Sequence, residues 1–128
     1  MKREVIEWVD KAEGDFISAR REYRARKRPN YDAACFHAQQ SAEKYLKAYL
    51  QASDVPIPKT HDLVRLLSEI PPTPVLESLR PAMATLTAYA VEYRYPGECA
   101  SQEVAKEAIT VCGAIRDELR HMLSLSRD

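Results

Sequence analysis

Apolar residues recur at alternating spacings of three and four in three long stretches, which is the periodicity of helices buried on one face. In the stretch from residue 4 to about 26 they are Val5, Val9, Ala12, Phe16, Ala19 and Tyr23. From about 32 to 53 they are Cys35, Ala38, Ala42, Tyr45 and Tyr49. From 101 to about 124 they are Val104, Ala108, Val111, Ile115, Leu119 and Met122. The pattern therefore predicts three long helices.

Prolines and capping residues divide the rest of the chain. Arg28-Pro29-Asn30 breaks the first pattern, and Asn30 or Asp32 is expected to cap the second helix. After a proline-containing linker, Thr60 is expected to cap a short helix that runs from 61 to about 70. A fourth main helix starts near Arg80, because the following proline is tolerated only in a first turn.

No segment alternates apolar and polar residues strongly enough to predict a strand. Amphipathic helices joined by short connections must bury their apolar faces against one another. The sequence therefore predicts an all-α protein: an up-and-down antiparallel four-helix bundle with one additional short helix. At 128 residues, we expect residues 1–128 to form one domain.

Composition excludes several classes of protein. The 19 Lys and Arg residues balance the 19 Asp and Glu residues, so overall charge does not indicate nucleic-acid binding. Three glycines rule out a Gly-rich phosphate loop, and three cysteines without a Cys-x-x-Cys pair or His spacing predict no metal and no cofactor. The N-terminus is acidic where a signal peptide is apolar, and no run is long enough to span a membrane, so we expect a cytoplasmic protein.

Three groups of residues could carry function. Arg94, between Tyr93 and Tyr95, could cap a helix, or its guanidinium could hold a phosphate or a stacked base. His61 could be structural or could transfer a proton. The third group, Gln40, Glu43, Lys44 and Lys47, lies on one helical side and is either a solvated face with a Glu43–Lys47 pair or, if buried, part of a site.

A run of basic residues is a fourth candidate. Residues 20–28 carry six bases and one acid. The run could contact RNA or an acidic protein, although bases also collect at helix C-termini because they complement the helix dipole.

Three segments together resemble the HEPN domain family (higher eukaryotes and prokaryotes nucleotide-binding). They are residues 33–48 (AACFHAQQSAEKYLKA), 60–63 (THDL) and 93–96 (YRYP). The resemblance implies a four-helix bundle that commonly dimerises. It also implies, for a stand-alone prokaryotic member, a small nucleotidyltransferase partner, with this chain as the nucleotide-binding subunit or as one half of a toxin–antitoxin pair.

Other branches of the family are metal-independent ribonucleases with an Arg followed four to six residues later by a His. No His follows Arg94 at that spacing. Arg116 and His121 fit it, but residues five apart on a helix point about 140° away from each other. This pair would need a partner subunit or a frayed helix end to converge.

Two functions are thus in competition, beside a simple dimeric scaffold that binds no ligand. The favoured one is a non-catalytic, homodimeric module that binds a nucleotide or a nucleotidyltransferase partner. Its expected ligand-binding residues are Gln40, Lys44, His61, Arg94 and Tyr95. The alternative is a metal-independent ribonuclease toxin acting through Arg116 and His121 on RNA.

Overall fold

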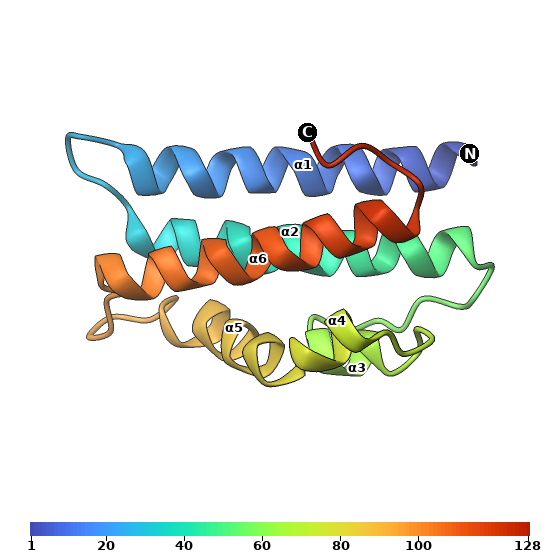
Figure 1. Cartoon of the computed structure of the whole chain (residues 1–128). Coiled ribbons are helices and arrows are strands. Elements are labelled where there is room, and N and C mark those ends of the chain that lie inside the picture. Colours follow the sequence, from blue (N-terminus) through green and yellow to red (C-terminus); the bar gives the residue numbers. More distant parts are fainter.

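The structure, a computed structural model, describes all of residues 1–128 and contains six helices and no strand. The helices are α1 (Arg3–Arg24), α2 (Tyr31–Ala52), α3 (Leu63–Leu67), α4 (Pro74–Ser78), α5 (Arg80–Glu92) and α6 (Gln102–Met122). Figure 1 shows α1 above α2 and α6, with α3, α4 and α5 below them. The predicted all-helical bundle is confirmed.

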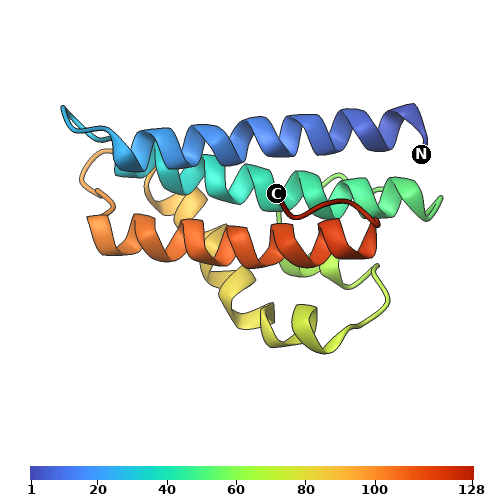
Figure 2. The ribbon, with the colours of Figure 1, turned by 45° about the horizontal axis from the view of Figure 1, so that its top comes forward.

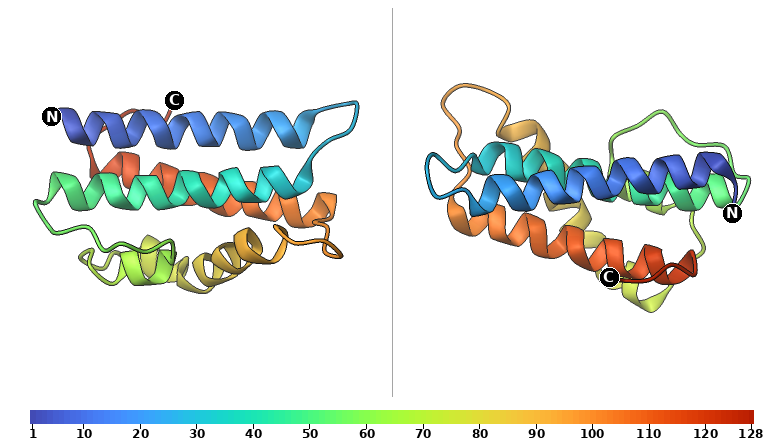
Figure 3. Two further views of the ribbon diagram at one scale, coloured as in Figure 1. Left: turned by 180° about the vertical axis from the view of Figure 1, so that it is seen from behind. Right: turned by 90° about the horizontal axis from the view of Figure 1, so that it is seen from above.

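Helix α2 lies at the centre of the bundle. It contacts α1, α3, α5 and α6, and α1 and α5 lie on opposite sides of it (Figure 3). Ala34, Ala38 and Ala42 are fully buried along α2, and their small side chains let the neighbouring helices approach closely. Leucine is the commonest residue in the remaining core, and each buried leucine stabilises the fold by about 1.5–3 kcal/mol.

The structure confirms one of the N-cap residues predicted from the sequence and corrects another. Asn30 caps α2 as predicted, with its Oδ1 accepting a hydrogen bond from the Ala33 amide at 2.9 Å. The expected cap Thr60 is wrong, because α3 begins at Leu63 and Asp62 accepts from the amides that follow it. Thr60 instead accepts a hydrogen bond from the backbone amide of Asp62.

The bundle has two short helices where one was expected. Thr73 caps α4 by accepting from the Leu76 amide at 3.1 Å, and Pro74 occupies the first position of that helix. Only Leu79 separates α4 from α5. Pro74 and Pro81 lie in the first turns of these helices, whereas Pro71 and Pro72 lie in the connection before α4.

Candidate functional site

A pocket of about 300 Å³ opens between α2, α5 and the segment that precedes α3. It is lined by Phe36, Gln39, Gln40, His61, Thr87, Ala90, Val91 and Arg94. Three segments far apart in the sequence therefore build one hollow beside α2.

Three of the five predicted ligand-binding residues line this pocket: Gln40, His61 and Arg94. Lys44, one turn beyond Gln40 on α2, does not, because its Nζ is 2.5 Å from a carboxylate oxygen of Asp15 on α1. Tyr95 also lies outside the lining and is 64% exposed beyond the end of α5. The expected convergence thus holds for three residues and fails for Lys44 and Tyr95.

Arg94 presents a cation without a partner. Its guanidinium makes no hydrogen bond and no ion pair, although its backbone amide donates to the Val91 carbonyl at 3.3 Å. Because the guanidinium donates to no carbonyl at the end of α5, the side chain of Arg94 does not cap that helix. A planar fork of donors is therefore available at the edge of the pocket.

A buried carboxylate lies beneath the pocket. Glu43 accepts hydrogen bonds from Lys47 Nζ at 2.9 Å, from Gln39 Nε2 at 3.2 Å and from His61 Nδ1 at 2.9 Å. Gln39 also donates to the backbone carbonyl of His61 at 2.8 Å, and Gln40 donates to Gln39 Oε1 at 2.9 Å. This network ties the His61 segment to α2.

The interpretation of this side of α2 as a solvated face is wrong. The Glu43–Lys47 pair forms, but the Glu43 side chain is only 4% exposed and that of Lys47 only 11%. The sequence could not show this burial, because the cover over α2 comes from residues far along the chain.

Glu43 is held ionised by its neighbours. Burial acts to raise the pKa of Glu43, but the hydrogen bonds from Lys47, Gln39 and His61 outweigh it and lower the pKa below its usual value. Because an ionised carboxylate only accepts hydrogen bonds, Nδ1 of His61 is the donor in their contact. The other ring nitrogen, Nε2, makes no hydrogen bond within the chain and is free for a ligand.

A second polar cluster, which has no signature in the sequence, joins α1, α2 and α6. Glu13 accepts two hydrogen bonds from the Arg116 guanidinium, at 2.7 and 2.8 Å, and one from the Tyr45 hydroxyl. Arg116 also donates to the carbonyl of Arg127 at 2.7 Å, where the chain after α6 turns back along the bundle (Figure 2). The guanidinium of Arg116 is thus fully engaged inside the protein.

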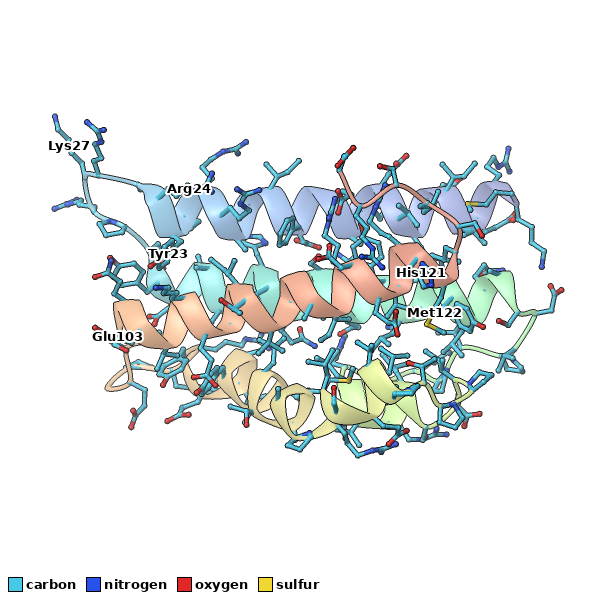
Figure 4. The ribbon with its side chains drawn as sticks, in the orientation of Figure 1. Tyr23, Arg24, Lys27, Glu103, His121 and Met122 are labelled. Carbon is cyan, nitrogen blue, oxygen red and sulfur yellow. The ribbon has the colours of Figure 1, made fainter.

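The alternative catalytic pair is not assembled within one chain. Arg116 is buried, whereas His121 is exposed and makes no side-chain hydrogen bond; Figure 4 shows His121 near the end of α6. Arg24 and Lys27, from the basic run, lie at the opposite end of the bundle. No basic residue of this run makes an ion pair.

The side chains that could bind a metal ion do not form a cluster. No group of three or more His, Cys, Asp or Glu side chains is arranged to hold a metal ion. Cys35 and Cys112 are buried, and Cys99 is exposed in the connection between α5 and α6. None of the helices combines the length and the apolar character needed to cross a membrane.

The fold and the pocket define a helical-bundle domain with a ligand-sized hollow beside its central helix. The model of the HEPN domain family matches residues 5–122, and the chain belongs to this family.

Two solved structures are similar over nearly the whole chain. TT1696 from Thermus thermophilus is 25% identical, with a TM-score of 0.80, covering 94% of this chain and 98% of that one. ST0689, described as an archaeal HEPN homologue, is 26% identical, with a TM-score of 0.77, covering 96% of this chain and 99% of that one. No curated protein matches the sequence of this chain.

Proposed function

We propose that this chain is a non-catalytic nucleotide-binding module, with the pocket beside α2 as its binding site. The pocket volume of about 300 Å³ lies at the lower end of the range of small-molecule sites. Three of its eight lining residues are apolar and five are polar, so several groups that could orient a ligand converge on the same space.

The observation that carries this proposal is the unpartnered guanidinium of Arg94 in the same pocket as His61 and Gln40. Arginine binds phosphate with charge-assisted hydrogen bonds, which are among the strongest that side chains make. The side-chain amide of Gln40 supplies a further polar contact, and Nε2 of His61 can donate to a phosphate oxygen when the ring carries both protons. The Glu43 network holds His61 in place before a ligand arrives, which reduces the ordering cost of binding.

Removal of the Arg94 guanidinium tests the proposal. We expect wild-type protein to bind ATP or GTP in calorimetric titrations, and Arg94→Ala to bind about tenfold to a hundredfold more weakly, because hydrogen bonds to charged groups contribute about 1.5–3 kcal/mol. Arg26→Ala is the matched control, since Arg26 is also exposed and unpaired but lies outside the pocket. Equal affinities of Arg94→Ala and wild type would exclude this site.

The proposal includes two partners: a second copy of this chain and a small nucleotidyltransferase, as in a toxin–antitoxin pair. HEPN domains often dimerise, and Phe36 and Val91 expose apolar surface at the edge of the pocket, where a second copy could cover it. Sedimentation equilibrium should give twice the 14.6 kDa mass of the chain. Co-purification with the product of a neighbouring nucleotidyltransferase gene tests the second partner.

A further inference from the structure

A second hollow continues the pocket beside α2. It has a volume of about 280 Å³ and shares Phe36, Ala90 and Arg94 with the first hollow. The two hollows therefore form one groove, with Arg94 where they meet. Their other linings differ: the first contains Gln40 and His61, and the second contains Tyr89, Tyr93 and two polar residues near the start of α2.

The second hollow has aromatic walls. Tyr89 lies in the last turn of α5 and Tyr93 is its C-cap residue, with their ring centroids 5.7 Å apart, and Phe36 approaches from α2. Aromatic side chains provide flat apolar faces on which nucleic-acid bases stack. The division of the groove thus matches the two ends of a nucleotide, with the base among the aromatic rings and the phosphates near Arg94 and His61.

The spacing along α2 agrees with this orientation. Asp32 lines the second hollow and Gln40 lines the first, and eight residues of helix separate them by about 12 Å along its axis. An extended nucleotide with its base at one end and its terminal phosphates at the other can span this length. The orientation also keeps the carboxylate of Asp32 away from the phosphates.

The polar groups of the second hollow present a particular hydrogen-bonding pattern. Asp32 accepts a hydrogen bond from the Ala100 amide through Oδ1, at 2.7 Å, and its Oδ2 has no partner. Oδ1 of Asn30 accepts from the Ala33 amide, which leaves the Nδ2 amide group of Asn30 as a donor. A carboxylate acceptor and an amide donor therefore line the same aromatic hollow.

We infer that this groove is selective for guanine nucleotides, with Asp32 reading the base; this inference rests on the proposed function. Guanine carries two adjacent donors, N1–H and the N2 amino group, beside the acceptor O6. The donors match the carboxylate of Asp32, and O6 matches the Nδ2 group of Asn30. Adenine places the acceptor N1 where guanine has a donor, so it would face the carboxylate with a lone pair.

The test compares GTP, ATP and xanthosine triphosphate by calorimetry on the full chain. We expect wild type to bind GTP about tenfold or more tightly than ATP, the discrimination typical of a good bidentate contact to a base. Asp32→Asn should weaken GTP binding by a similar factor and strengthen binding of xanthosine triphosphate, whose base has a carbonyl in place of the N2 amino group. In this variant the carbonyl oxygen of the side-chain amide can still accept the hydrogen bond from the backbone amide of Ala100, so the fold should be retained.

Controls separate this inference from the proposed function. Asp10→Asn, at an exposed and unpaired carboxylate on α1, should leave all three affinities unchanged. Equal binding of GTP and ATP by wild type, or no change of preference in Asp32→Asn, would overturn the guanine assignment and leave the nucleotide-binding function standing. Failure of wild type to bind any nucleotide would overturn the proposed function itself.

Discussion

Glu13→Ala is expected to destabilise the fold by about 3–4 kcal/mol, near the low end of the cost of removing one partner from a buried ion pair, because the Glu13 side chain is itself 27% exposed. Arg116 would lose both hydrogen bonds to Glu13 while its side chain, 8% exposed, stays inside the bundle. The Tyr45 hydroxyl would lose its acceptor as well. Since domains of this kind are stable by about 5–15 kcal/mol, urea denaturation should show a much lower midpoint.

Glu69→Ala is the matched control for this variant. Glu69 pairs with Arg65 at 2.7 Å on the exposed surface at the end of α3, so its removal should cost about 0.5 kcal/mol or less. A similar loss of stability in Glu13→Ala and Glu69→Ala would show that the Glu13–Arg116 pair does not hold α1 to α6.

Glu43→Gln is expected to have the second-largest effect, about 3 kcal/mol, and to weaken nucleotide binding as well. The ammonium of Lys47 would remain largely buried without a counter-charge. His61 would also lose the ionised acceptor that positions its ring at the pocket. Thermal unfolding measures the first effect, with an expected fall of roughly 10 °C in Tm, and calorimetric titration measures the second.

The pH dependence of stability gives this variant a distinct signature. Because the folded-state pKa of Glu43 lies below its usual value, its contribution is present above the pKa of the unfolded chain and is lost as the pH falls through the folded-state pKa. Glu43→Gln should remove that part of the acid destabilisation. Glu13, whose pKa is also lowered, should maintain the rest, so a profile unchanged from wild type would contradict the role of Glu43.

The long helices could be predicted from the sequence because their apolar spacing follows directly from the geometry of a helix packed on one side. The predicted helix ends are less accurate where two residues close in the sequence could both act as the N-cap. At the start of α3, Asp62 and Thr60 both carry suitable oxygens, and only the backbone conformation shows that Asp62 serves. The two short helices were underestimated because prolines can both end one helix and begin the next.

Part of the site could be predicted from the family resemblance, whereas contacts that depend on how two helices are rotated against each other could not. Gln40, His61 and Arg94 were brought together by resemblance to a family, and the structure places all three in one pocket. The pairing of Lys44 with Asp15 depends on how α1 is rotated about its axis relative to α2. The apolar periodicity shows which face of each helix is buried, but not which individual residues meet across the two helices. The Glu13–Arg116 pair spans 103 positions of the chain and has no local signature.

The distribution of the three thiols offers a chemical handle on the groove. Burial raises the pKa of the Cys35 thiol to about 11 and also raises that of Cys112, so both resist modification at neutral pH. Cys99 is exposed and directly precedes Ala100, whose backbone amide donates a hydrogen bond to Asp32. A maleimide dye should therefore attach at this one position in the unaltered protein and report, by its emission, on occupancy of the neighbouring hollow.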